Sequence, residues 1–332
     1  MPDTYQQELD WAITAVRQAA AICRNVQRQI TPDIMEKQDR SPVTVADFAS
    51  QAAICRYLLA VASGDAIVAE EDATELRKPE SAPFVARIEC ELKRVGIEPT
   101  GEDIWNWIDR GNSTGGSGRF WTLDPIDGTK GFISGRQYAV ALALIVEGRV
   151  EVGVLGCPNL AVSPEHNEPA GVLLTAVRGA GTMIVPLDED VTPSKVTVSG
   201  TRLPSDARFC ESAESGHSSH SRSAQIAKQL RMTRPALRLD SQAKYATVAR
   251  GEVDIYFRLP TRKGYVEKIW DHAGGVLVVE EAGGVVSDID GKPLEFQHGI
   301  GLTSNRGVLV TNGYLHEQVL DAIAATSELE TP

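Results

Sequence analysis

The stretch that decides the fold is WTLDPIDGTKG, residues 121–131. Its apolar start is typical of a buried β-strand, and the strand leads directly into Asp124 and Asp127. Pro125 stiffens the turn between these two acids, and Gly128 opens it. We therefore expect a strand that ends in a rigid turn and directs two carboxylates toward one point.

Carboxylates on a fixed turn suit a hard divalent cation such as Mg²⁺, which prefers oxygen ligands. The carbonyl of Ile126 is a further candidate ligand, and the N–H groups and hydroxyl of Gly128 and Thr129 could cradle a phosphate. Lys130 could contact the phosphate or be solvated. The alternative is an ordinary Asp-rich turn whose side chains are all solvated.

Three more acids stand at the ends of expected elements. Asp47 and Asp271 begin helices, where either could be a simple cap, and Glu70 ends a short apolar strand, where it could be solvated. If all these carboxylates share one pocket, their repulsion requires bound cations.

Around this centre the pattern indicates a mixed order of helices and strands, with hairpins among them, and hence α+β layers rather than a purely parallel sheet. Pro32 and Pro42 mark the segment 31–44 as a loop or flap. A second lobe is expected to begin near Thr192, which gives an N-terminal lobe of residues 1–191 and a C-terminal lobe of residues 192–332. The expected helices span 6–29, 46–61, 82–95, 223–230, 243–250, 271–283 and 315–325, and the expected strands 66–69, 120–123, 138–146, 149–156, 196–199, 207–212, 254–259 and 284–289.

Composition narrows the range of functions. The 332 residues carry a net charge of −12, which argues against a nucleic acid polymer or an anionic membrane surface as partner. Five scattered cysteines without a C-x-x-C pair, and an N-terminus without a basic patch and apolar core, favour a cytoplasmic protein. No P-loop motif is present.

Four phrases, SPVTVADFASQ, VAEED, GRFWTLDPIDGTKGF and IWDHAGGVLVVEEAGG, resemble the successive signatures of the lithium-sensitive, magnesium-dependent phosphatases of the inositol monophosphatase superfamily. The resemblance covers almost the whole chain. QYAVALALIVEGRVEVGVLGCPNL, GHSSH and LDSQAKY are similar to one branch, the 3′(2′),5′-bisphosphate nucleotidases. It implies a layered α-β-α-β-α sandwich with the site between two lobes.

The resemblance also implies a ligand set for two or three Mg²⁺ ions. One ion would be held by Glu70, Asp124 and the carbonyl of Ile126, and another by Asp124, Asp127 and Asp271. A third, weaker ion would lie near Asp47. Asp47 and Thr129 would orient and deprotonate a water that attacks the phosphorus in line.

Substrate contacts are implied at Gly128 and Thr129, with the nucleotide gripped mainly from the second lobe. Lys244 and Arg258 would neutralise a 5′-phosphate, which explains how an acidic protein could bind a polyanion. The positions implied in that lobe are His217, Ser241, Lys244, Arg258 and Asp271.

The implied reaction is hydrolysis of adenosine 3′,5′-bisphosphate to AMP and phosphate, with 3′-phosphoadenylyl sulfate as a second substrate and a place in sulfur assimilation. The alternatives are an inositol polyphosphate 1-phosphatase or inositol monophosphatase, and a nucleotide sensor without turnover. His217 and His220 could instead form a zinc pair, and His272 is expected to pack or to support a ligand. The sequence departs from the family's pattern at Ala69, where Gly is usual. The pattern does not indicate the oligomeric state, the residues that recognise adenine, or a role for residues 111–118.

Overall fold

A seven-stranded mixed sheet forms the centre of the molecule in this computed structural model. The described residues are 4–29, 34–36, 42–162, 171–189, 191–213, 220–260, 262 and 264–328. β3 and β4 are parallel, and every other neighbouring pair in the sheet is antiparallel. Its strands, in spatial order, are β3 (Ala66–Ala69), β4 (Arg119–Asp127), β5 (Ala139–Val146), β6 (Arg149–Cys157), β7 (Val172–Val177), β8 (Gly181–Pro186) and β9 (Ser194–Val196).

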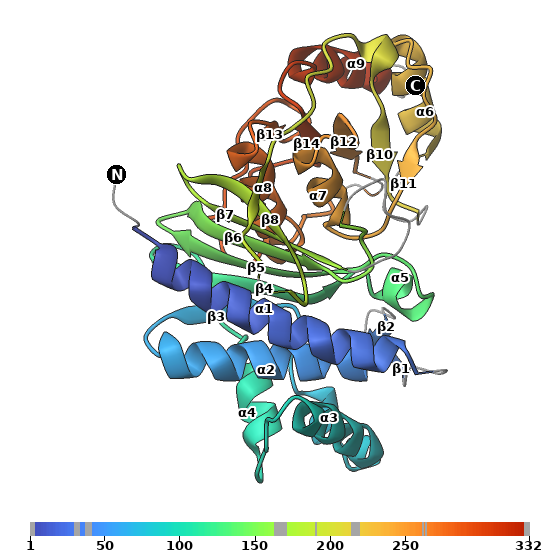
Figure 1. Cartoon of the computed structure of the whole chain (residues 1–332). Helices are drawn as coiled ribbons and strands as arrows, with labels where there is room; N and C mark the ends of the chain where they lie inside the picture. Colours follow the sequence, from blue (N-terminus) through green and yellow to red (C-terminus); the bar gives the residue numbers. More distant parts are fainter. Residues whose placement is uncertain are drawn as a thin grey trace.

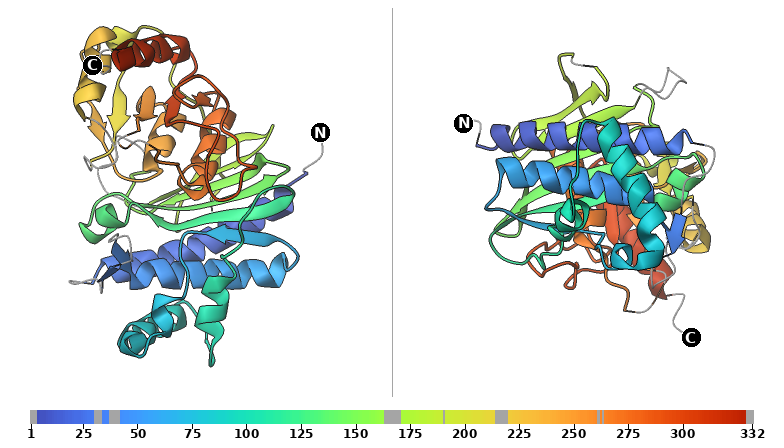
Figure 2. Two further views of the ribbon diagram at one scale, coloured as in Figure 1. Left: turned by 180° about the vertical axis from the view of Figure 1, so that it is seen from behind. Right: turned by 90° about the horizontal axis from the view of Figure 1, so that it is seen from below.

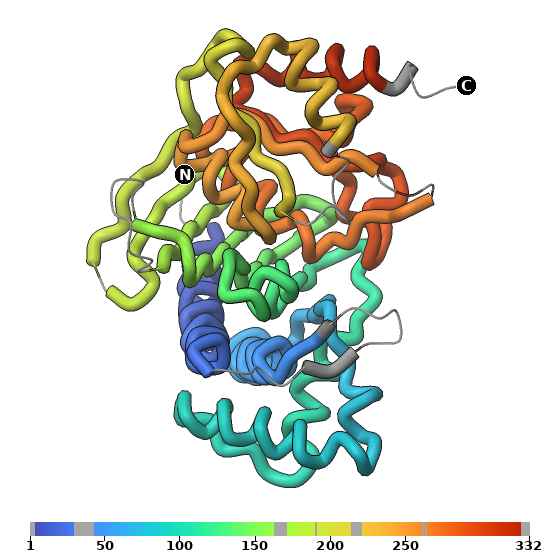
Figure 3. Tube along the Cα trace, turned by 90° about the vertical axis from the view of Figure 1, so that its right-hand side faces the viewer, coloured from blue at the N-terminus to red at the C-terminus, as the bar shows by residue number. Residues whose placement is uncertain are grey.

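Two long helices, α1 (Gln6–Gln27) and α2 (Val45–Val61), cover one face of this sheet (Figure 1). Both bury alanines, among them Ala15, Ala19 and Ala49, and such small side chains let helices approach closely. Figure 3 shows the two helices side by side beneath the sheet. Helices α3 (Ala82–Arg94) and α4 (Asp103–Asp109) lie on the outer side of α2, as the view from behind in Figure 2 also shows.

The opposite face of the sheet packs on α7 (Ala243–Ala249) and α8 (Ala273–Glu281). A second, five-stranded sheet covers these helices in turn, and α6 (His220–Gln229) and α9 (His316–Glu328) lie outside it. The predicted α-β-α-β-α layering is therefore confirmed. The second sheet runs in the order β11 (Leu237–Arg238), β10 (Phe209–Glu211), β12 (Ile255–Arg258), β14 (Val308–Thr311) and β13 (Val285–Ser287).

Glycines make the contact between α8 and the central sheet unusually close. A Cβ added to Gly153 of β6 would lie 2.8 Å from the carbonyl oxygen of Gly274. A Cβ on Gly275 would lie 2.4 Å from the ring of Tyr245 on α7. Real Cβ atoms do not approach other atoms so closely, so residues with side chains cannot replace these glycines without moving the layers apart.

Several elements differ from the sequence-based expectation. The segment 31–44, expected as a loop or flap, contains an antiparallel pair of short strands, β1 (Ile34–Glu36) and β2 (Pro42–Thr44). The expected strand at 196–199 is instead β9, which ends at Val196. β7, β8 and α4 were not expected, and neither was the short helix α5 (Thr129–Ile133). Short 3₁₀ turns lie at Glu75–Arg77, Pro79–Ser81, Pro204–Asp206 and Ile269–Asp271.

Two further expectations concern the chain as a whole. The predicted lobe boundary between residues 191 and 192 falls between β8 and β9, and it stays a prediction.

All five cysteines are free, and all but Cys90 are buried. Among the described residues, no helix combines the length and the apolar character needed to cross a bilayer.

Candidate active site

The first two acids lie side by side on the neighbouring strands β3 and β4 of the central sheet, Glu70 just after the end of β3 and Asp124 within β4. β3 and β4 are parallel, with Ala69 opposite Leu123, so the residues that follow them, Glu70 and Asp124, emerge side by side. Asp124 is buried, whereas Glu70 is half-buried. The parallel pairing of a short apolar strand with a longer one therefore brings these two acids next to one another.

An irregularity in β4 positions Asp127. The register of β4 against β5 shifts between Asp124 and Asp127, as expected for a strand containing Pro125. The Ile126 N–H donates to Asp124 Oδ1 at 3.1 Å, and the Gln242 N–H donates to Asp127 Oδ2 at 2.6 Å. The backbone N–H of Gln242, which is distant in sequence, thus holds Asp127 in place.

Asp47 is held by the first turn of α2. It forms a capping box with Thr44, whose N–H and hydroxyl both donate to Asp47 Oδ2, at 2.8 and 2.6 Å. Thr129 Oγ1 lies 3.4 Å from the other oxygen, Oδ1, and 3.3 Å from the carbonyl oxygen of Ile126. The cap therefore fixes one oxygen of Asp47 and directs the other toward Thr129.

Asp271 reaches the same place from the far side of the sheet. It ends the 3₁₀ turn that precedes α8, and this turn packs against β4 and β5. The Arg258 guanidinium lies 3.4 Å from Asp271 Oδ2. Segments far apart in the sequence thus meet at one end of the central sheet.

The electrostatics of Asp124 show that the acids converge. Burial raises the pKa of Asp124 well above its ordinary value, and the neighbouring carboxylates raise it further. Those neighbours, in decreasing order of effect, are Glu70, Asp127, Asp271 and Asp47. The other four predicted acids therefore lie within electrostatic reach of Asp124.

Asp127 and Asp271 also have raised pKa values. Burial, followed by repulsion from Asp271, raises the pKa of Asp127 to about 7, although Lys244 and Arg258 oppose the shift. Burial likewise raises the pKa of Asp271, against the attraction of Arg258. Nearby cations of the protein therefore do not neutralise this cluster.

This donor set fits divalent metal ions. Crowded, partly buried carboxylates are tolerable at neutral pH when cations lie among them, and oxygen donors suit Mg²⁺ rather than softer metals. The Ile126 carbonyl lies on the same turn, as expected for a backbone ligand. Among the described residues, the one acid–histidine group whose donor atoms all lie within 4.8 Å of one another is a different one, Glu267, Asp271 and His272, and it shares Asp271 with the predicted set.

The side chains of Glu267 and His272 in this second group contact one another and other residues of the protein. Glu267 Oε2 lies 2.9 Å from Arg258 Nε and 3.2 Å from His272 Nε2, and His272 Nδ1 lies 2.7 Å from the Tyr245 hydroxyl. His272 is fully buried, which agrees with its expected packing or supporting role. The chain from Tyr245 through His272 and Glu267 therefore holds Arg258 next to Asp271.

Two predicted substrate residues adjoin the metal acids. Ser241 adopts a left-handed conformation, φ 71°, and its backbone nitrogen would lie 3.3 Å from a Cβ placed on Gly128. Lys244 is buried on α7, 5.2 Å above the ring of Tyr256, and burial lowers its pKa despite the attraction of Asp127. His217 lies outside the described residues, and His220 begins α6 without a described side chain, so the zinc-pair alternative stays a prediction.

The whole chain matches a single family. The model of the inositol monophosphatase family matches residues 4–328. The chain belongs to this family. Among inositol monophosphatase structures, the Thermotoga maritima IMPase superposes with a TM-score of 0.66 at 20% identity, covering 98% of this chain and 99% of that one. The inositol monophosphatase from Anabaena has a TM-score of 0.61 at 20% identity, covering 98% and 97%. At such identities the structures establish the fold alone.

More similar relatives within the family carry one name. The 3′(2′),5′-bisphosphate nucleotidase of Schizosaccharomyces pombe is 42% identical and covers 98% of this chain and 97% of its own length. The 3′(2′),5′-bisphosphate nucleotidase 1 of Arabidopsis thaliana is 44% identical and covers 96% of each chain. The predicted membership of the superfamily is therefore confirmed.

Several residues that shape the site were not predicted. Thr44 could have been found, because T-x-x-D before an apolar helix is a capping-box signal. Gln242 had no such signal, although it binds Asp127 through its N–H and the N–H of Gly275 through its side chain. No local sequence pattern indicates Glu267 either, because its partners are distant in sequence or belong to a different element.

Proposed function

We propose that this chain is a magnesium-dependent phosphatase that removes the 3′-phosphate of adenosine 3′,5′-bisphosphate, giving AMP and phosphate. The observation that carries the proposal is the convergence on Asp124 of Glu70, Asp127, Asp271 and Asp47. The name shared by relatives at 42% and 44% identity supports the nucleotide substrate.

Glu70, Asp124, Asp127, Asp271 and the Ile126 carbonyl would hold two or three Mg²⁺ ions. Bound there, the ions would supply positive charge to the phosphate oxygens and acidify a water. Lithium inhibition is expected if it displaces one of these ions.

Asp47 and Thr129 would manage the proton of the attacking water. Thr129 Oγ1 can accept a proton from water while its own hydrogen passes to Asp47 Oδ1, 3.4 Å away. The water oxygen would then attack phosphorus and the bond to the 3′-oxygen would break. The 3′-oxygen would leave as a hydroxyl after taking a proton from solvent, and no phosphoenzyme would form. Thr44 keeps Asp47 Oδ1 aimed correctly by binding Oδ2.

The second lobe would hold the rest of the substrate. We assign the 5′-phosphate to Lys244 and Arg258, supported by Ser241 and His217, and phosphate contacts of the reacting group to Gly128 and Thr129. 3′-Phosphoadenylyl sulfate offers the same phosphates and is expected to be a second substrate. With its scattered free cysteines, the chain is proposed to act in the cytoplasm, in nucleotide and sulfur metabolism.

Phosphate release by the purified protein tests the proposal. The panel comprises adenosine 3′,5′-bisphosphate, 3′-phosphoadenylyl sulfate, inositol 1,4-bisphosphate and inositol monophosphate, each with Mg²⁺ and with a chelator. We expect Mg²⁺-dependent turnover with the nucleotides preferred. Preference for an inositol phosphate would replace the substrate assignment, and binding without turnover would indicate a sensor.

A further inference from the structure

One side of α2 carries polar residues that face the segments of the candidate metal ligands. Asp47, Ser50 and Gln51 are three and four residues apart on this helix, so their side chains leave it on the same side. All three residues are fully buried. Buried polar side chains are costly unless they form hydrogen bonds, so the partners of these three indicate what this side of the helix does.

Two of the three contact the segment that runs from β4 into α5. Asp47 Oδ1 lies near the Thr129 hydroxyl, as described above. Ser50 Oγ donates to the Pro125 carbonyl oxygen at 3.2 Å. Pro125 lies in the part of β4 that carries the acids, so α2 holds the backbone of one ligand segment through Ser50.

Gln51 contacts the other ligand segment with its whole amide group. Its Nε2 donates to the Glu71 carbonyl oxygen at 2.5 Å and to the Ile108 carbonyl oxygen at 3.0 Å. Its Oε1 accepts from the Glu71 N–H at 3.1 Å. Both amide hydrogens and the amide oxygen are therefore in use. Gln51 thus pairs with the Glu71 backbone as a neighbouring strand would, at the point where the chain has left β3.

Glu70 lies between two backbone positions that are both held. On one side, the Ala69 N–H donates to the Gly111 carbonyl oxygen at 2.8 Å, and Ala69 ends the pairing of β3 with β4. On the other side, Gln51 holds both the N–H and the carbonyl of Glu71. Only Glu70 separates these two positions, so the direction in which its side chain leaves the backbone is restricted.

Gly111 makes room for this arrangement. A Cβ added to Gly111 would lie 2.6 Å from Ala69 Cβ and 2.9 Å from Gln51 Nε2. A side chain here would therefore displace either the end of β3 or the amide group of Gln51. No sequence pattern indicates a role for the segment that begins at Gly111, whereas this contact gives its first residue a defined one.

We propose that Gln51 is a positioning residue for metal binding, which directs the Glu70 carboxylate toward Asp124 by fixing the backbone of Glu71. The proposal rests on the proposed function, which assigns Glu70 and Asp124 to one Mg²⁺ ion. A ligand that is already oriented loses less conformational entropy when the ion binds. Removal of hydrogen bonds that orient a metal ligand typically weakens metal binding roughly 10–100-fold.

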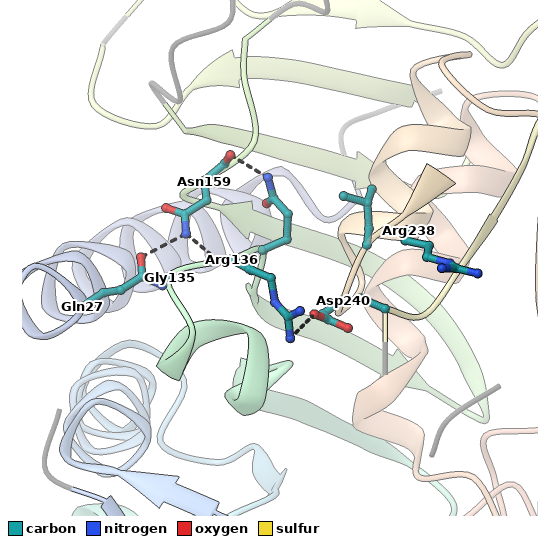
Figure 4. A pocket seen from close by; sticks show the side chains of 9 residues that line it. Gln27, Gly135, Arg136, Asn159, Arg238 and Asp240 are labelled. Atoms are coloured by element: carbon teal, nitrogen blue, oxygen red, sulfur yellow. Dashed lines mark hydrogen bonds and ion pairs between the residues drawn. The ribbon is translucent and has the colours of Figure 1, made fainter. Parts of the chain in front are cut away.

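Calorimetric titration of the metal-free full chain with Mg²⁺ tests this proposal without relying on activity. Gln51→Met keeps the length of the side chain and removes its hydrogen bonds to the backbone. We expect the Mg²⁺ dissociation constant to rise about tenfold or more. Asn159→Leu is the matched control, because the Asn159 amide also holds a loop, by donating to the Arg136 carbonyl at 2.7 Å (Figure 4). That loop carries no candidate metal ligand, so this variant should keep the wild-type dissociation constant.

A second comparison separates positioning from general stability. Glu70→Gln alters the candidate ligand itself and should also weaken Mg²⁺ binding. If Gln51 acts through Glu70, adding Gln51→Met to Glu70→Gln should change the dissociation constant by less than about twofold. The added substitution should still destabilise the fold, because it leaves buried backbone groups without partners. A structural role alone would give the same fold-change in both backgrounds.

The outcomes separate the positioning role from the activity. If Gln51→Met keeps the wild-type Mg²⁺ affinity, or weakens it equally with and without Glu70→Gln, the positioning role is wrong and the phosphatase function stands. If Gln51→Met does not fold, hydrogen exchange of the wild type decides. A Glu71 N–H that exchanges as fast as an exposed amide overturns the role, and strong protection supports it. If the wild type binds Mg²⁺ but releases phosphate from no substrate of the panel, the proposed function fails, and calorimetry still decides the role of Gln51.

Discussion

Among the single residues of the site, Asp127 allows a specific prediction about its pKa. Burial and Asp271 raise this pKa, whereas Lys244 and Arg258 lower it. Its pKa of about 7, against an ordinary value of 3.8, means that the metal-free fold favours the protonated form. The folded state therefore gains stability from protonated Asp127. This stability is present in full below pH 3.8 and is lost as pH rises through about 7. Above that pH the charged group weakens the metal-free protein.

Asp127→Asn should therefore abolish activity and yet stabilise the metal-free protein at pH 8, by about 1–2 kcal/mol in the free energy of unfolding. Denaturant titration in the presence of a chelator measures this. The same comparison at pH 5, where wild-type Asp127 is mostly protonated, should show a smaller gain. Equal destabilisation at both pH values would show that the repulsion is absent.

Glu267 makes a second prediction, because it holds Arg258 in place. Glu267→Gln removes the charge that lies 2.9 Å from Arg258 Nε while keeping the shape of the side chain. We expect KM for adenosine 3′,5′-bisphosphate to rise about tenfold, with a smaller effect on adenosine 3′-monophosphate, which lacks the 5′-phosphate.

Steady-state kinetics on both substrates test the role of Glu267. Tyr245→Phe, which removes only the hydroxyl at the far end of the same chain, is the matched variant and should have a weaker effect in the same direction. An equal loss on both substrates would assign Glu267 to general stability instead.

The acids of the site could be selected from sequence because their types and positions carry chemical meaning. Asp47 and Asp271 stand next to helix starts, as expected, whereas β4 extends through Asp124 and Asp127, which were expected in a turn after the strand. Gln242 and Glu267 could not be selected in this way. Their importance arises from tertiary contacts, of Gln242 with Asp127 and of Glu267 with Arg258 and His272, which no local pattern contains.

At the scale of elements, the turn between β4 and α5 depends on one glycine. Gly128 has φ 86°, and a Cβ there would lie 3.1 Å from Ser241 Cβ. Gly128→Ala should lower the free energy of unfolding by about 1–3 kcal/mol and reduce kcat strongly, because the segment that carries the candidate metal ligands would move.

Gly96→Ala provides the control for this prediction. Gly96 also has a positive φ, 78°, but no atom lies within 4 Å of its added Cβ. It should share the backbone strain of Gly128→Ala without the clash. Thermal unfolding and kinetics of both variants therefore isolate the contact with Ser241, and identical behaviour would mean that this contact is unimportant.

The sequence predicted the strongly patterned elements well and the weakly patterned ones poorly. The helices α1 and α2 and the hairpin of β5 and β6 appear within about two residues of expectation, since each has a sustained apolar period. β1 and β2 contain only three residues each, and Pro42 lies in one of them. Such strands exist because of their pairing, which local propensity does not encode.

At the scale of the whole molecule, the candidate metal site joins the two halves of the chain. Glu70, Asp124 and Asp127 come from the central sheet, whereas Asp271 comes from the turn before α8. Ions bound among them would cross-link these parts, so Mg²⁺ should raise the melting temperature. At one hundred times its dissociation constant, a single ion adds about 2.7 kcal/mol.

Thermal unfolding with increasing Mg²⁺ measures this effect. In Asp124→Asn, which removes the acid nearest the centre of the cluster, the increase should largely disappear. K⁺ at matched ionic strength controls for screening. An equal response of wild type and variant would place the stabilising ion elsewhere.

Composition and periodicity alone indicated α+β layers, and the order of layers came from the resemblance to a family. The sequence did not reveal how closely the layers meet. Gly153 and Gly274 bring backbone against backbone, and this depends on two positions more than a hundred residues apart.

That glycine contact has a consequence for turnover. Because backbone contacts backbone there, with no side chain between, α8 and the central sheet are in fixed positions relative to one another. Asp124 and Asp271 are therefore held at a fixed separation before any substrate binds. The entropic cost of gathering mutually repelling acids is then met once, during folding, and does not recur in each catalytic cycle.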